Sequence, residues 1–170
     1  MRHSGNRYGV PVIRRGDVVP GQKKVAEHPM QGREHKIDNA LIGAAGVHWV
    51  VSELSRRGLV ALPTIRNTSA IDVLVTNPAG SFHANLQVKT SQNRTSFWLI
   101  GKRYKNWLGR NNFYVFVRYL EKESRFEAFL ETAGRVAKET DPEWVPAWYL
   151  PKKEAERKRV SRQWMRFGQR

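Results

Sequence analysis

Apolar residues recur at helical spacing in the first clearly patterned segment of the chain. The apolar positions are Ile37, Leu41, Ala44, Ala45, Val47, Val51 and Leu54, which recur near the spacing of helical turns. Gly58 then supplies a C-terminal stop. This spacing predicts a helix from about 37 to 57.

Two glycines, Gly43 and Gly46, interrupt the helical pattern. Each costs about 1 kcal/mol in a helix interior relative to alanine, because glycine loses more backbone freedom on folding. Their presence favours close packing of the helix backbone against a neighbouring strand.

Strand-like runs follow the predicted helix. Three of them occupy 59–65, 71–76 and 82–90, and the turn sequence at 77–80, Asn-Pro-Ala-Gly, makes the last two a predicted hairpin. Further strands are expected at 113–117 and 126–130, and helices at 131–139 and 152–167. This order predicts an α/β domain in which helices flank a central mixed β-sheet.

Charge adds a partner to this picture. The 170 residues include 30 Lys and Arg against 15 Asp and Glu, a formal net charge of +15. This charge predicts binding to a polyanion, with nucleic acid as the first candidate and an anionic membrane as the second. The chain has no cysteine, which excludes disulfides and thiolate metal sites. It has no apolar run long enough to span a membrane, so we expect a cytoplasmic protein without membrane contacts.

The basic residues are unevenly distributed, and they divide the chain into three predicted parts. Residues 1–36 hold eight Lys and Arg among many glycines and prolines and are expected to form a basic, extended N-terminal arm. The α/β domain is predicted at 37–150, and a basic C-terminal helix at 151–170. No acidic residue lies between Asp72 and Glu121, which suits a surface facing a phosphate backbone.

Asp72 is the one polar residue in the apolar run 71–75, where an unpaired buried carboxylate would be costly. In the next strand, Gln87 and Lys89 alternate with apolar residues and therefore share one face. The predicted hairpin sets Asp72 beside them. The Asp72 carboxylate, the Gln87 amide oxygen and the backbone carbonyl of Val88 are hard ligands suited to Mg²⁺ or Mn²⁺. Lys89 would position or deprotonate a water and stabilise charge on phosphorus.

At these residues the chain resembles the PD-(D/E)xK nuclease superfamily, which includes restriction endonucleases and Holliday-junction resolvases. The resemblance covers about 37–117 and rests on Gly43-Ala44-Ala45-Gly46, Gly58, Ile71-Asp72 and Gln87-Val88-Lys89-Thr90. It implies a restriction-endonuclease-like core, with Mg²⁺-dependent cleavage of DNA. It also implies that Asp72 binds the metal, that Gln87 takes the second ligand position and that Lys89 is the lysine of the motif.

The chain departs from the family pattern at three positions. Residues 70–71, Ala-Ile, stand where a proline usually precedes the aspartate, and Gln87 replaces the usual acid, so the metal should be held more weakly. Val47 stands where many relatives carry an acidic residue in the first helix. His48 and Glu53 are the nearby candidates to replace that acid.

Glu53 also has a purely structural interpretation. It lies three and four residues before Arg56 and Arg57, which is the spacing of surface ion pairs on a helix. The sequence alone leaves open whether Glu53 is a metal ligand or an ion-pair partner.

Other polar and basic residues are candidate contacts to nucleic acid: Ser91, Arg94, Lys102, Arg103, Lys105, Lys152, Lys153 and Arg157. Aromatic residues interleave with some of them. Tyr104 and Trp107 would either stack on bases or pack in the core, whereas core packing is expected for Trp98.

These observations lead to one principal prediction, a metal-dependent endonuclease that hydrolyses DNA. A homodimer would let two such sites cut two strands. A catalytically inactive nucleic-acid-binding protein on the same scaffold is one alternative. A basic RNA-associated protein is another, although it leaves Asp72 without an explanation.

Overall fold

A computed structural model describes residues 37–65, 71–92, 95–140 and 145–168. The predicted N-terminal arm at 1–36 and the predicted DNA contact Arg94 lie outside these residues. No helix in the described ranges is long and apolar enough to cross a membrane.

Helix α1 (Asn39–Arg56) confirms the predicted first helix. It begins after Asp38, whose Oδ1 accepts a hydrogen bond of 2.6 Å from the Ala40 N–H, and it ends before Gly58, which adopts the left-handed φ of +80° that glycine tolerates best. Its buried residues recur every fourth position: Ile42, Gly46, Val50 and Leu54.

Within the described ranges, the central sheet has five strands in the order β1-β2-β3-β5-β6. They are β1 (Val60–Pro63), β2 (Val73–Thr76), β3 (His83–Gln92), β5 (Asn112–Leu120) and β6 (Arg125–Thr132). Only β3 and β5 pair in parallel, so the sheet is mixed, as predicted. The β2–β3 hairpin is also confirmed.

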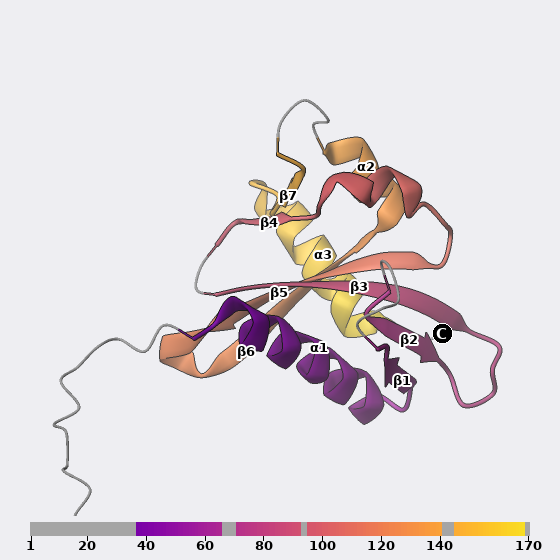
Figure 1. The fold of residues 1–170 in the computed structure, drawn as a ribbon. Coiled ribbons are helices and arrows are strands. Elements are labelled where there is room, and N and C mark those ends of the chain that lie inside the picture. Colours follow the sequence, from indigo (N-terminus) through magenta and orange to yellow (C-terminus); the bar gives the residue numbers. More distant parts are fainter. Residues whose placement is uncertain (1–36, 66–70, 93–94, 141–144, 169–170) are drawn as a thin grey trace, which may run out of the picture. The chain divides into compact units, whose positions relative to one another are not determined.

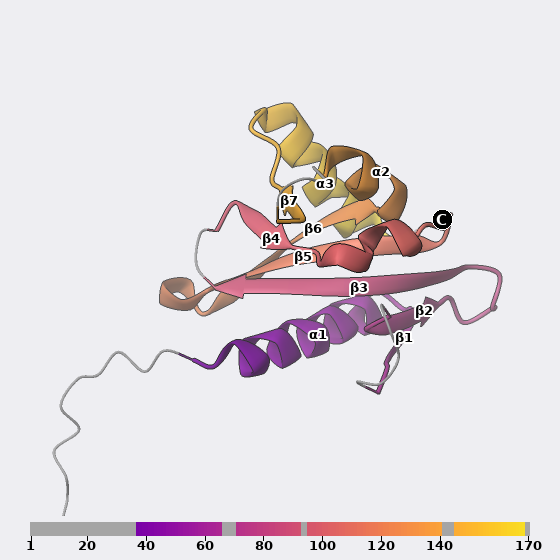
Figure 2. The same ribbon diagram turned by 45° about the horizontal axis from the view of Figure 1, so that its top comes forward.

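The parallel step from β3 to β5 needs a crossover connection, which covers one face of the sheet. It consists of β4 (Phe97–Leu99) and the 3₁₀ helix η1 (Lys102–Asn106). On the same side lie α2 (Ala133–Glu139) and β7 (Ala147–Tyr149), which pairs with β4. Figures 1 and 2 show α1 on the opposite face.

Strand alternation divides the core into two clusters. Leu86 and Val88 of β3 and Val115 of β5 face α1, together with Val50 and Leu54. On the other face, buried aromatic residues dominate: Trp98, Tyr104, Trp107, Tyr114, Phe116 and Trp148.

The second cluster settles the role of the interleaved aromatic residues. Trp98, Tyr104 and Trp107 are all buried, so base stacking by Tyr104 and Trp107 is not supported. The Trp98 indole N–H donates to the Val117 carbonyl at 2.9 Å. These side chains fix the crossover onto the sheet.

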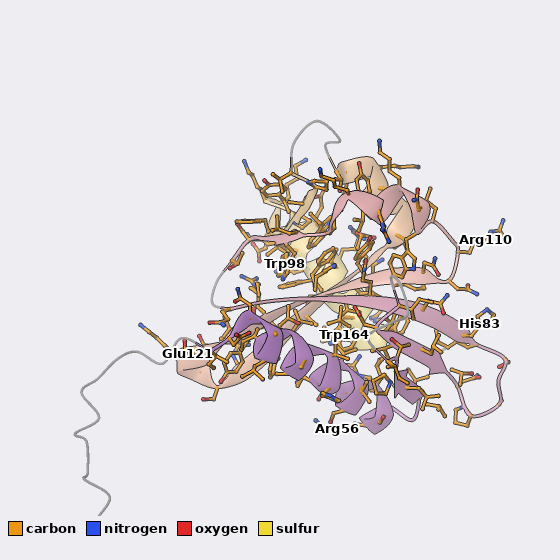
Figure 3. All side chains as sticks on the ribbon, viewed as in Figure 1. Arg56, His83, Trp98, Arg110, Glu121 and Trp164 are labelled. Atoms are coloured by element: carbon orange, nitrogen blue, oxygen red, sulfur yellow. The ribbon has the colours of Figure 1, made fainter. Side chains whose placement is uncertain are left out.

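Helix α3 (Glu154–Arg166) belongs to the same folded unit. It packs against β6 and contributes Val160 to the aromatic cluster and Trp164 to the cluster beneath α1. Figure 3 shows Trp98 and Trp164 in the interior, on different elements of the core. The short 3₁₀ helix η2 (Glu121–Glu123) joins β5 to β6.

Candidate functional site

Asp72 stands directly before β2, and the two neighbouring strands hold its backbone. Its N–H donates to the Leu86 carbonyl at 2.8 Å, and its carbonyl accepts from the Thr64 N–H at 3.0 Å. The carboxylate Oδ2 accepts a hydrogen bond of 2.7 Å from the Val88 N–H. Both the position and the orientation of this carboxylate are therefore fixed by backbone contacts.

The register of the hairpin brings Gln87 opposite Asp72. Val73 pairs with Leu86, and both are fully buried in the cluster beneath α1. Because successive side chains alternate, Asp72, Gln87 and Lys89 lie on the face turned away from α1. All three are half-buried. The structure thus brings together the three residues that the sequence proposed as catalytic.

Burial and mutual attraction act in opposite directions on the two charged groups. Burial raises the pKa of Asp72, while the hydrogen bond from Val88 and the charge of Lys89 oppose that rise. Burial lowers the pKa of Lys89, and the charge of Asp72 opposes that fall. Each group is therefore shifted toward its neutral form, as happens when ionisable groups leave water.

Two further oxygen atoms are available beside the carboxylate. The side chain of Gln87 has no hydrogen-bond partner among the described residues, so its amide oxygen is free to accept a ligand. In a strand, the N–H and C=O of one residue point to the same side, so the Val88 carbonyl is directed toward the Asp72 side, where its N–H already reaches. Carboxylate, amide and peptide oxygens together fit the ligand preferences of Mg²⁺ and Mn²⁺.

The arrangement is poor in negative charge. No group of three His, Cys, Asp or Glu side chains that could hold a metal occurs within the described ranges. Asp72 therefore supplies the only carboxylate for which the described residues show a place in the site.

Glu53 is not part of the arrangement. Its carboxylate pairs with Arg56 at 2.9 Å and with Arg57 at 3.4 Å, which is the structural alternative that the sequence left open. His48 is exposed on α1, and Val47 packs against the core. Neither Glu53 nor His48 replaces the missing helix acid in this structure.

Exposed cations border the sheet face that carries Asp72, Gln87 and Lys89. Tyr104 and Trp107 anchor η1 over Tyr114, the register neighbour of Gln87, and this places Lys102, Arg103 and Lys105 nearby with exposed side chains. Ser91 lies farther along the Lys89 face of β3, and its hydroxyl contacts the Val117 carbonyl at 3.5 Å.

The remaining predicted contacts belong to α3 and the segment that precedes it. Lys152, Lys153 and Arg157 are exposed there. Arg157 also lines a separate cavity of about 460 Å³ with Trp49 and Phe126. Within the described ranges, no hydrogen bond or ion pair joins these three residues to Asp72 or Lys89, and the structure gives them no defined place in the site.

Sequence reasoning missed a polar network that extends the Gln87 face toward the start of β3. Asn85 donates through Nδ2 to Oδ1 of Asn112 at 2.9 Å, and Asn111 Nδ2 lies 2.6 Å from Nε2 of His83. Figure 3 shows His83 and Arg110 at this end of the strands. The alternation of polar residues along β3 was the available signal for this network. Asn111 and Asn112 reach the polar residues of β3 only through the parallel β3–β5 pairing.

Comparisons with known proteins assign no family. No family model and no curated protein matches the chain. Among solved structures, it is similar to a bacterial homing endonuclease, I-Ssp6803I, with a TM-score of 0.44 and 13% identity over 69% of this chain and 78% of that one. A likeness at this level establishes neither a family nor an activity.

Proposed function

We propose that the protein is a metal-dependent endonuclease that hydrolyses DNA phosphodiester bonds on a restriction-endonuclease-like core. The observation that carries this proposal is the half-buried Asp72–Lys89 pair, set beside the amide of Gln87, which has no hydrogen-bond partner in the described part of the chain. Taking both charges out of water is costly, and such perturbed pairs occur preferentially at functional sites.

Three oxygen donors would hold the metal ion. Asp72 contributes a carboxylate, Gln87 an amide oxygen and Val88 its backbone carbonyl. A bound Mg²⁺ or Mn²⁺ supplies a Lewis acid for the phosphoryl oxygen and lowers the pKa of a bound water. The Val88 N–H keeps the Asp72 carboxylate in one orientation, so the site needs little rearrangement to receive the ion.

Lys89 acts on the substrate side of the same face. Its ammonium orients the attacking water and donates to the phosphoryl oxygens as negative charge develops there. Burial lowers the pKa of Lys89, which brings the amine closer to a state in which it accepts a proton.

The charge of the protein supports DNA as the partner. A net charge of +15 and the exposed cations of η1 favour contacts with a phosphate backbone. Such contacts release counterions, so DNA affinity should fall steeply as the salt concentration rises.

A second candidate is a nucleic-acid-binding protein on the same scaffold that has lost cleavage. The observation that favours it is the single carboxylate of the site, because Glu53 is engaged by Arg56 and Arg57. An RNA-associated protein would account for the charge but gives Asp72 and Lys89 no role.

A cleavage assay separates these candidates. The wild type, Lys89→Ala and the exposed-lysine control Lys122→Ala are incubated with supercoiled plasmid and with branched DNA, in Mg²⁺, Mn²⁺ or EDTA. We expect metal-dependent cutting by the wild type and the control but not by Lys89→Ala. DNA binding without any cutting would select the binding protein, and cutting that survives Lys89→Ala would refute the assigned mechanism.

A further inference from the structure

A second candidate binding site lies beside β6, with its aromatic side chains on the sheet face opposite Gln87. It is a cavity of about 730 Å³ lined by the rings of Phe82, Phe113 and Phe167 and by three arginines of α3, Arg159, Arg162 and Arg166. Phe82 and Phe113 pack against the cluster beneath α1, which places them away from the Asp72–Lys89 face. The cavity is thus separate from the proposed catalytic site.

The aromatic wall of the cavity is built from interlocking rings. Phe167 meets Phe82 edge-on at 5.6 Å and Phe113 at 5.3 Å between ring centroids. Phe167 is buried, whereas Phe82 and Phe113 are only half-buried and present part of their rings to the cavity. Such a wall offers flat apolar surface to a planar ligand.

The arginines provide the polar side of the cavity, and they are not equivalent. Arg159 is held by Glu131 at 2.7 Å and by Gln163 at 2.8 Å. Arg162 donates through Nε to the Lys158 carbonyl at 3.2 Å, which leaves its terminal nitrogens available.

Arg166 lies one helical turn beyond Arg162, and no acidic partner for either occurs among the described residues. Among the described residues no acidic side chain lines the cavity, and of its three arginines Glu131 pairs only with Arg159, so the charges of Arg162 and Arg166 are uncompensated and favour an anionic ligand.

We propose that this cavity binds a nucleotide unit, with the phosphate on Arg162 and Arg166 and the base against the phenylalanine rings. Planar guanidinium groups match phosphate geometry, and aromatic side chains stack on any base. The volume lies within the range of small-molecule sites. The basic segment 1–36 is a poor occupant, since its eight Lys and Arg outnumber three acidic residues.

The nucleotide could come from two sources, a free nucleotide or an unpaired nucleotide within a strand, and two probes separate them. Thymidine 5′-monophosphate is titrated by calorimetry, and a fluorescein-labelled ten-nucleotide oligothymidylate by anisotropy. Both titrations use the full chain in EDTA, so they do not depend on cleavage. A protein that never cuts DNA can still bind these probes, which keeps this inference distinguishable from the proposed nuclease activity.

The decisive variants carry the same loss of charge at different places. Arg162→Ala/Arg166→Ala removes the phosphate contacts, and Lys122→Ala/Lys138→Ala removes two exposed cations elsewhere. We expect the arginine variant to weaken binding about tenfold or more and to reduce the salt slope by roughly one to two, against less than about twofold for the control.

A third variant tests the aromatic wall. Phe82→Leu keeps an apolar side chain but removes a ring, and we expect about fivefold weaker oligonucleotide binding with unchanged binding of inorganic phosphate. Thermal melts confirm that each variant is folded.

Tight binding of the monophosphate alone identifies a free-nucleotide site, and preference for the oligonucleotide identifies a strand contact. Equal weakening by both double variants would overturn the proposal. So would inorganic phosphate that binds as tightly as the monophosphate, or the absence of binding by the wild type.

Discussion

Gly46 connects the helix pattern to the candidate site, and its replacement by alanine tests that connection. A Cβ at this position would overlap Oγ1 of Thr90 and lie 2.9 Å from its Cβ; Thr90 follows Lys89 directly on β3. Contacts below 3.0 Å require something to shift. At Gly43, by contrast, an added Cβ meets no atom of the described residues within 4 Å apart from the adjoining helix backbone.

The two substitutions should change stability in opposite directions. Glycine to alanine in a helix interior gains about 1 kcal/mol, and Gly43→Ala should show that gain. At Gly46 the same gain is set against overpacking, which costs roughly 1–3 kcal/mol and more where a backbone must move. We expect Gly46→Ala to lower the free energy of unfolding by about 1–2 kcal/mol, a separation from Gly43→Ala of about 2–3 kcal/mol.

Urea titration followed by circular dichroism measures this separation, and a double-mutant cycle locates its cause. Thr90→Ala removes Oγ1 and Cγ2 of the clashing side chain, so Gly46→Ala should cost at least about 1 kcal/mol less in the Thr90→Ala background. If Gly46→Ala stabilised the protein as Gly43→Ala does, or if Thr90→Ala left its cost unchanged, the close packing of α1 on β3 would be refuted.

Three further substitutions test the groups around the site. Tyr114 carries a buried hydroxyl that has no hydrogen-bond partner among the described residues, and burial raises its pKa to about 12, so Tyr114→Phe should stabilise the protein by roughly 1 kcal/mol in thermal melts. Burial is the main cause that raises the pKa of Asp72 in the folded protein above its value in the unfolded chain. The contribution of this carboxyl to folding stability is therefore complete below the pKa of the unfolded chain, and it is lost as pH rises through the pKa of the folded protein. In EDTA, Asp72→Asn should therefore melt above the wild type near pH 7, with the difference closing toward about pH 3; a difference that grew on acidification would contradict this account. Glu53→Gln should cost only about 0.5 kcal/mol and leave cleavage unchanged, whereas lost cleavage would return Glu53 to the metal site.

Local patterns predicted most of the elements that position the site. Helix α1 has a strong apolar period, an N-cap and a terminal glycine, and the β2–β3 hairpin has a short turn between two apolar runs. Because a hairpin pairs residues close in sequence, the approach of Asp72 to Gln87 could be predicted from the sequence alone. The alternation along β3 likewise predicted the common face of Gln87 and Lys89.

Elements that depend on distant pairing could not be predicted in this way. Strand β4 is only three residues long and exists through its partner β7, about fifty positions later in the chain. The burial of Tyr104 and Trp107 depends on the same crossover, which folds a basic and aromatic segment onto the sheet. The Asn85–Asn112 contact likewise requires the parallel pairing of β3 with β5.

The charge pattern could be interpreted correctly only in part. The acid-poor segment between Asp72 and Glu121 includes the cations of η1, which border the Gln87 face. Three arginines of α3 instead line a cavity beside β6, because Val160 and Trp164 turn the helix onto β6 and the core. A helical charge pattern does not reveal which strand the helix will meet.

The central claim is that Gln87 holds the second ligand position of a Mg²⁺ site, and the Mg²⁺ dependence of plasmid cleavage by Gln87→Glu tests it most directly. A full negative charge about 4 Å from a cation contributes on the order of several kcal/mol per unit charge at an effective dielectric constant near 20, so the Mg²⁺ concentration for half-maximal cleavage should fall at least about tenfold. Asn39→Asp, the same amide-to-acid change at an exposed position of α1, should leave this Mg²⁺ concentration unchanged. An unaltered Mg²⁺ requirement in Gln87→Glu, or equal shifts in both variants, would contradict the account.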